Sequence, residues 1–243
     1  MRDYKIETEK RTQFIRDQLK EAGAQGIVFG NSGGKDSALV GILCKLACEN
    51  TVGLIMPCGS SRNYSDDISD ALLVSRLYRI EARKVDLTSA AEEFKRTLRE
   101  VTGLTAAAEP NIAPRMRMTA LYAVSASEGR LVAGTDNRSE RYIGYFTKWG
   151  DGAFDFNPIS DLTVTEIYEF LKHLDAPRRI INKVPSAGLY DGQTDEAELG
   201  VSYTSIDKLL LSGKCPSEDM EIISRHHKAS EHKRRMPAAY GEK

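Results

Sequence analysis

The chain has 243 residues, 41% of them hydrophobic and 28% charged, which suits one ordinary α/β domain with enough core to fold unaided. Its net charge of −1 gives no basic field for nucleic acid or an anionic membrane, and no apolar run approaches the roughly 20 residues of a membrane helix. Four cysteines without disulfide or zinc spacing predict reduced thiols in a cytoplasmic protein.

Helix-like and strand-like patterns alternate through the first two thirds of the chain. In chain order we expect a helix at Ile6–Ala22 ended by Gly23, a strand at 26–31, a helix at Ser37–Cys48, a strand at Thr51–Met56, a helix at Asp66–Tyr78, a strand at Glu81–Val85, a helix at Ala90–Glu100, a flexible surface loop at Gly103–Pro110, a helix at Met116–Ser127 and a strand at Arg130–Ala133. Beyond residue 135 the pattern loosens, with helices expected near 163–173, 202–211 and 217–229.

This alternation predicts a doubly wound, Rossmann-like α/β fold, in which helices cover both faces of a parallel sheet. We see no internal repeat and no linker, and therefore expect a single domain over residues 1–243. Ligands of such sheets bind beyond the carboxyl ends of the strands. Asn31, Met56, Asp86 and Gly134 fall at such ends, so the loops that follow them should share one rim.

The segment after the first strand carries the most informative motif. It consists of Gly30, Asn31, Ser32, Gly33, Gly34, Lys35, Asp36 and Ser37. Backbone N–H groups at the start of the following helix would form an anion site, and Asp36 beside a phosphate makes best sense if a divalent cation bridges them. The spacing differs from the Walker loop. It resembles the pyrophosphate loop of the N-type ATP pyrophosphatases, although a glycine-rich turn capped by Ser and Asp is a plainer interpretation.

Further motifs follow in order along the chain. They are Gly134–Glu140, Gly144–Gly152, Pro185–Leu189, Gly192–Glu196, Glu198–Gly200 and Ser230–Arg234. Together with the first loop they resemble the NAD synthetase family, which amidates nicotinate adenine dinucleotide (deamido-NAD), from about residue 10 to about residue 240. The resemblance implies an adenine nucleotide alpha hydrolase-like fold. No glutamine-hydrolysing domain precedes the loop, so we expect the ammonia-dependent form.

The resemblance also implies a two-step ligase reaction. ATP activates the carboxylate of deamido-NAD as an acyl-adenylate with release of pyrophosphate, and ammonia then displaces AMP to form NAD. Mg²⁺ is expected on Asp36 and Glu140, because it takes few protein carboxylates together with phosphate oxygens. ATP is expected on the Gly30–Ser37 loop, Thr135 and Ser186. The family is typically a homodimer with the dinucleotide near the subunit interface.

Several charged residues match positions that contact the dinucleotide in the family. These residues are Arg115, Lys148, Asp155, His232 and Lys233. Two phosphates, ribose hydroxyls and an acid group call for such a mixture of cations and acceptors. Asp151 would hold ammonium or accept its proton, unless it is only a turn aspartate between glycines. We take Asp151, Asp155 and Lys148 as the catalytic candidates.

One position departs from the family pattern. Val164 stands where the family usually carries a lysine that reaches the ATP phosphates, and valine cannot neutralise phosphate charge. Lys35 stands at a loop position that is often apolar or uncharged in relatives. Either Lys35 supplies part of the missing charge, or its side chain points to solvent and the phosphate site is weaker.

Two other functions share the first motif. A tRNA-modifying ATP pyrophosphatase, of the thiolase or lysidine-ligase type, would carry an RNA-binding region or catalytic cysteines, and the near-neutral charge argues against it. A low-activity relative that only binds nucleotide is favoured by Val164 alone. Detection of NAD, AMP and pyrophosphate as products would discriminate among the three.

Overall fold

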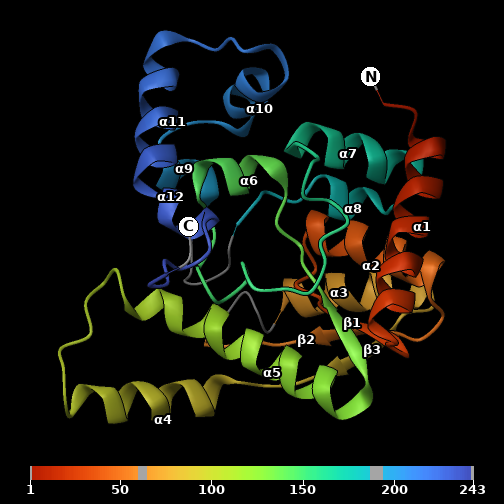
Figure 1. Cartoon of the computed structure of the whole chain (residues 1–243), viewed down its shortest axis with the longest axis horizontal. Coiled ribbons are helices and arrows are strands. Elements are labelled where there is room, and N and C mark those ends of the chain that lie inside the picture. The colour runs from red at the N-terminus through yellow and green to blue at the C-terminus, as the bar shows by residue number, and fades with distance from the viewer. Residues whose placement is uncertain (1, 60–64, 187–193, 242–243) are drawn as a thin grey trace.

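The computed structural model describes residues 2–59, 65–186 and 194–241, whose arrangement is shown in Figure 1. In this part of the chain the strands are β1 (Gly26–Gly30), β2 (Thr51–Ile55), β3 (Glu81–Lys84) and β4 (Arg130–Ala133). The helices are α1 (Tyr4–Ala22), α2 (Lys35–Ala47), α3 (Asp66–Leu77), α4 (Thr88–Arg99), the 3-10 turn η2 (Glu109–Asn111), α5 (Ile112–Glu128), α6 (Arg138–Ile143), α7 (Val164–His173), α8 (Arg178–Ile181), α9 (Asp195–Leu199), α10 (Tyr203–Ser212), α11 (Ser217–Ala229) and α12 (Glu231–Arg234).

The strands form one parallel sheet in the order β3-β2-β1-β4. Phe29 of β1 lies opposite Gly53 of β2 on one side and Ala133 of β4 on the other. The chain therefore winds outward in both directions from β1. The strand order reverses between β1 and β4, and ligands of such sheets bind beyond the carboxyl ends of the strands at this point. This topology confirms the doubly wound α/β fold expected from the sequence.

Helices cover both faces of this sheet, as expected. Alternate residues of a strand point to opposite faces. Ile27 and Phe29 belong to a buried cluster that includes residues of α1, α2 and α7, while Val28 belongs to a second cluster against which Leu121 of α5 packs. These two clusters hold β1 rigidly, so the loop that leaves it starts from a fixed point.

The part of the chain after β4 builds a helical lobe beside the carboxyl end of the sheet (Figure 1). A third hydrophobic cluster joins α6, the start of α7, α10 and α11 through buried residues that include Ile143, Val164, Tyr203, Ile206 and Ile223. The helices expected at 163–173, 202–211 and 217–229 are confirmed. The short helices α6, α8, α9 and α12 were not predicted, because they contain too few residues to show a helical period.

Several helices begin earlier than expected, and glycine or proline accounts for two of these boundaries. Gly34 is the N-cap of α2, which begins at Lys35 rather than at Ser37. Pro114 lies in the first turn of α5, where a proline loses no intrahelical hydrogen bond, so this helix begins before Met116. Gly23 ends α1 as predicted, with a left-handed φ of 63° and its N–H directed to the carbonyls of the last turn. Among the described residues, none of the helices has the length and apolar character that a membrane span requires.

Candidate active site

The loop between β1 and α2 presents an uncapped helix start. Gly33 adopts a φ of 71°, a conformation that favours glycine and turns the chain sharply into α2. The Ser32 hydroxyl accepts from the N–H of Gly34 at 3.3 Å and lies 3.1 Å from the Ser37 hydroxyl. Within the described part of the chain, no side chain caps the N-terminus of α2. The first N–H groups of this helix are therefore available to an anion.

A cavity of about 570 Å³ opens above this helix start. Its walls come from the β1–α2 loop, from the segment after β4, from α5 and from the chain around Ser186. The residues expected to bind ATP that line it are Gly30, Asn31, Ser32, Gly34, Lys35, Asp36, Ser37, Thr135 and Ser186. Gly33 instead forms the turn behind the loop, directed at α3. The volume falls in the range of small-molecule sites in proteins.

The two expected metal ligands face each other across the cavity floor. The N-terminal turn of α2 places Asp36, and the N-terminal turn of α6 places Glu140. Asn137 joins them, because its side-chain amide donates to Asp36 at 3.0 Å and its backbone N–H donates to Glu140 at 3.2 Å. Burial and the charge of Asp36 raise the pKa of Glu140 to about 8, although the nearby Lys35 ammonium opposes the rise.

The oxygens of this pair fit a divalent cation that also binds phosphate. Among the described residues, no group of three or more His, Cys, Asp or Glu side chains could hold a metal by itself. Two carboxylates beside an anion-binding helix start are instead the arrangement expected for Mg²⁺, which completes its shell with waters and substrate phosphates. Asp36 and Glu140 are thus the residues that would hold the ion.

Lys35 does not point to solvent, which corrects one of the two alternatives drawn from the sequence. Its side chain is only 6% exposed, and its ammonium lies 2.7 Å from Oδ2 of Asp36 and 3.6 Å from Oε1 of Glu140. The ammonium also stands 5.6 Å from the centre of the Tyr203 ring. Burial acts to lower the pKa of Lys35, but the charges of Asp36 and Glu140 outweigh it and the net pKa is raised. Lys35 is therefore a charged part of the site.

Asp136 and Asp151 place two further carboxyl groups at the same cavity. Asp136 is buried, and within the described residues its Oδ2 has no hydrogen-bond partner. Burial and the charges of Asp151 and Glu140 raise the pKa of Asp136. The carboxylate of Asp151 accepts from the N–H of Thr147 at 2.9 Å and is reached by solvent through the cavity. Desolvation by the surrounding protein raises the pKa of Asp151, although the hydrogen bond from the Thr147 N–H opposes the rise.

Three of the expected dinucleotide-binding residues, Arg115, Lys148 and His232, form a chain of contacts. Arg115 donates to the Lys148 carbonyl at 3.3 Å, and the Lys148 ammonium donates to the His232 carbonyl at 2.8 Å. Lys233 lines the cavity, and its ammonium donates to the carbonyls of Gly144 and Phe146 at 2.8 Å each. Burial lowers the pKa of Lys233, opposed by the charge of Asp151.

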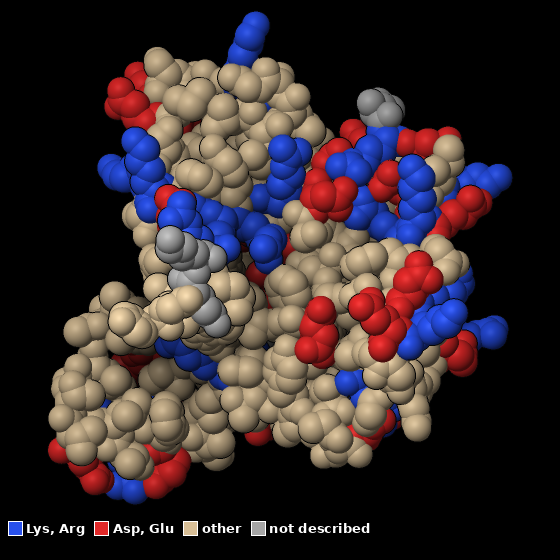
Figure 2. Space-filling view, viewed as in Figure 1, with Lys and Arg blue, Asp and Glu red and all other residues tan. Residues whose placement is uncertain are grey.

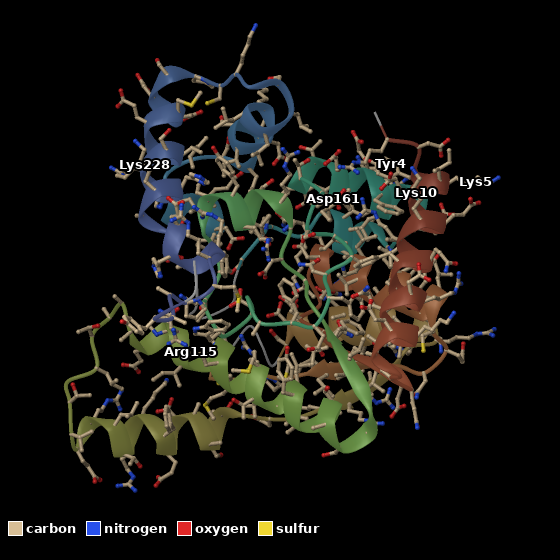
Figure 3. The ribbon with its side chains drawn as sticks, viewed as in Figure 1. Tyr4, Lys5, Lys10, Arg115, Asp161 and Lys228 are labelled. Atoms are coloured by element: carbon tan, nitrogen blue, oxygen red, sulfur yellow. The ribbon has the colours of Figure 1, made fainter. Side chains whose placement is uncertain are left out.

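The surface around these residues is positively charged. Figure 2 shows Lys and Arg side chains gathered over α11 and α12 on the side that faces α5. Figure 3 shows Arg115 on α5, below the lobe that carries those helices. Arg115, Lys148 and His232 do not line the cavity itself. They stand outside it, where they could bind the part of a ligand that extends beyond the cavity.

Asp155 lies apart from the cavity. Its carboxylate accepts from the backbone N–H of Val132 at 2.7 Å and from the Tyr122 hydroxyl at 3.1 Å. It therefore ties β4 to α5, and it is not among the residues that line the cavity. This contact set does not favour a catalytic role for Asp155 within one subunit.

Sequence reasoning gave no role to two residues that position the site, the partly buried Lys183 and the buried Asn137. Lys183 donates to the Gly33 carbonyl at 3.1 Å and pairs with Asp67 at 2.8 Å and with Asp70 at 2.7 Å. Asn137, described above, bridges the two metal-ligand candidates. Asn137 stood inside the quoted Gly134–Glu140 motif and invited a role there. The position of Lys183, shortly before Pro185, gave no comparable signal.

Val164 occupies a hydrophobic environment. It is 4% exposed at the start of α7 and belongs to the same cluster as Tyr203. Val164 and Tyr203 also line one small pocket beside the main cavity. A lysine at this position would thus begin close to the ring over which the Lys35 ammonium lies. Lysine side chains at positions 35 and 164 would therefore reach the same region of the site.

Comparison with known proteins identifies the family. The NAD synthase family model matches residues 7–237. An NH3-dependent NAD+ synthetase from Carboxydothermus hydrogenoformans is 42% identical, over 97% of this chain and 97% of that protein. The solved structure of an NMN synthetase from Francisella tularensis has a TM-score of 0.93 and 36% identity, covering 100% of both chains. An NH3-dependent NAD synthetase from Campylobacter jejuni has a TM-score of 0.80 and 33% identity, covering 98% of this chain and 99% of that one. The loop, the paired carboxylates and these matches agree, and the chain belongs to the NAD synthase family of ligases.

Proposed function

We propose that this protein amidates deamido-NAD to NAD with ammonia, at the expense of ATP. In the first step an oxygen of the nicotinate carboxylate attacks the α-phosphorus of ATP, and pyrophosphate leaves. In the second step ammonia attacks the acyl carbon, gives up a proton, and AMP leaves. The observation that carries the proposal is that one cavity is lined both by an uncapped helix start, which suits phosphates, and by the carboxyl groups of Asp136 and Asp151.

The residues of the chain have distinct roles in this proposal. The N–H groups at the start of α2, with Ser32 and Ser37, bind the departing pyrophosphate and hold it in place. Asp36 and Glu140 would hold Mg²⁺, which neutralises phosphate charge when bound. Asp151 takes the proton of ammonium beside the acyl carbon, a role for which its raised pKa is suited.

The direct test is product analysis. The protein is incubated with ATP, Mg²⁺, ammonium and deamido-NAD, and NAD, AMP and pyrophosphate are measured. One mole of each product per mole of deamido-NAD consumed supports the proposal. ADP as the nucleotide product, or no NAD, would contradict it. The match to the NAD synthase family model argues against a tRNA-modifying activity.

The role of Asp151 has a matched control in Asp155, which is a similar carboxylate outside the cavity. Asp151→Asn should slow NAD formation by about 10²- to 10⁴-fold, the usual contribution of a positioned base. In a single turnover the first equivalent of pyrophosphate should be released at close to the wild-type rate, because the first step needs no proton acceptor. Asp155→Asn should slow both products equally if it acts only through packing. Equal slowing of NAD formation and of single-turnover pyrophosphate release in Asp151→Asn would refute the assignment.

A second candidate substrate is nicotinate mononucleotide, which offers the same carboxylate without the adenylate half. It is favoured by the TM-score of 0.93 to a protein described as an NMN synthetase, against 0.80 to an NAD synthetase. Comparison of kcat/KM for the two acids decides between them. We retain deamido-NAD as the first choice, because Arg115, Lys148 and His232 extend the site beyond the cavity.

Assembly and location belong to the same proposal. We propose a homodimer in the cytoplasm, as in the sequence-based expectation. The four cysteines are free thiols in the structure, which supports a reducing compartment. Sedimentation of the purified protein, with and without deamido-NAD, tests the dimer.

A further inference from the structure

The ammonium of Lys35 lies where a cation would stand between Asp36 and Glu140. It is 2.7 Å from one carboxylate and 3.6 Å from the other. The aromatic face of Tyr203 covers it at 5.6 Å. Three groups that attract positive charge thus surround the ammonium.

Three of the four carboxylate oxygens of this pair already accept a hydrogen bond. Lys35 takes Oδ2 of Asp36, and the side-chain amide of Asn137 takes Oδ1. The backbone N–H of Asn137 donates to Oε2 of Glu140, and the Lys35 ammonium lies 3.6 Å from Oε1. A divalent ion that enters here meets a fixed positive charge a few ångströms away, and such like charges repel strongly in a buried site.

We propose that Lys35 holds the cation position of the free enzyme, so that a divalent metal binds between Asp36 and Glu140 only together with ATP. The proposal rests on the metal pair named under the proposed function. When phosphate oxygens arrive at the start of α2, they offer the ammonium a new partner. Lysine has a flexible four-carbon stem, and Lys35 is the first residue of α2, so its ammonium can reach phosphates at that helix start. Metal and nucleotide therefore enter as one unit.

The absence of a lysine at position 164 is consistent with this arrangement. Val164 contributes no charge, and its neighbour Tyr203 is free to cover the Lys35 ammonium. A second lysine from α7 would crowd a second positive charge into the same region. Lys35 thus combines two tasks, as counter-ion of the carboxylates before ATP binds and as phosphate ligand afterwards.

The test measures Mn²⁺ binding to the nucleotide-free protein by electron paramagnetic resonance. Wild type should show no bound Mn²⁺ that depends on Glu140, so that wild type and Glu140→Gln give the same titration. Lys35→Met preserves the length and apolar stem of the side chain. It should gain a Mn²⁺ site at least about tenfold tighter than any in wild type, because the repelling charge is removed. The double variant Lys35→Met/Glu140→Gln should lose that site.

Two results would overturn the proposal. One is a Glu140-dependent Mn²⁺ site in nucleotide-free wild type, a comparison that does not require Lys35→Met to fold. The other is a folded Lys35→Met protein, judged by its circular dichroism and melting transition, that gains no site. A parallel titration adds an ATP analogue with a methylene α–β bridge. Failure of every variant to bind this analogue would count against the proposed ATP-dependent function, whereas the nucleotide-free titrations decide the role of Lys35.

Discussion

The phosphate loop depends on a glycine at position 33 for two separable reasons. Its φ of 71° lies in the left-handed region, where a residue with a Cβ loses about 1 kcal/mol. A Cβ would also collide with the Asp67 carbonyl and stand 3.0 Å from the Ala71 nitrogen. Both are backbone atoms of a packed helix, and overpacking of this kind costs about 1–3 kcal/mol. We therefore expect Gly33→Ala to lower the free energy of unfolding by about 2–4 kcal/mol.

Gly213 separates the two costs. It has the same φ of 71° at the end of α10, but no described atom lies within 4 Å of a Cβ built there. Gly213→Ala should therefore lose only the backbone term, about 1 kcal/mol. For a chain of this size 1 kcal/mol corresponds to roughly 2–4 °C in melting temperature. Calorimetry of both variants measures the difference, and ATP should stabilise Gly213→Ala but not Gly33→Ala. Equal melting temperatures for the two variants would refute the reasoning.

Substitutions at Asp161, Lys183 and Val164 test contacts at the N-terminal helix and around the site. Asp161 lies near the N-terminus (Figure 3), where Arg11 donates to its carboxylate oxygens at 2.6 and 3.0 Å. The hydrogen bonds and charge of Arg11 outweigh the effect of burial and lower the pKa of Asp161. Asp161→Asn should therefore lower the free energy of unfolding by about 1 kcal/mol at neutral pH. Because the folded pKa is the lower one, this contribution is present above about pH 4 and disappears in more acidic solution, so the stability of wild type and variant should converge there in urea titrations. Lys183→Met removes one ion-pair partner of the buried Asp70 and should lower the free energy of unfolding by about 3 kcal/mol. If the two residues are coupled, Lys183→Met/Asp70→Asn should lose less than the sum of the two single variants. Adding Val164→Lys to Lys35→Met should lower the KM for ATP about tenfold relative to Lys35→Met alone. An unchanged KM would mean that the side chains at positions 35 and 164 do not reach the same phosphates.

The sequence predicted the parts of the site that are local in the chain. The order of strand, glycine-rich turn and helix around Gly33 follows from apolar period and backbone freedom, both of which can be seen within a short segment. The capping box of Asn137 and Glu140 is also local, but the sequence analysis did not recognise it, because α6 is too short to show a helical period. The order of motifs along the chain was enough to suggest the family, which the comparisons with known proteins then confirmed.

The sequence could not predict contacts between distant segments. It left open whether Lys35 faces solvent, because that depends on Glu140 and Tyr203, which approach it only when α6 and α10 pack beside α2. It grouped Asp155 with the substrate residues, although the carboxylate is directed to β4 and α5. It gave no role to Lys183, which reaches Gly33 and Asp70 across the fold.

The difference between these two sets has one physical cause. Backbone conformation and helix starts are governed by neighbours within a few residues, so the amino-acid sequence alone determined the alternation of strands and helices, the phosphate loop and the family motifs. The charge state and direction of a long side chain depend on which groups surround it once water is removed. Only the tertiary structure decided that the Lys35 ammonium lies between two carboxylates rather than in solvent.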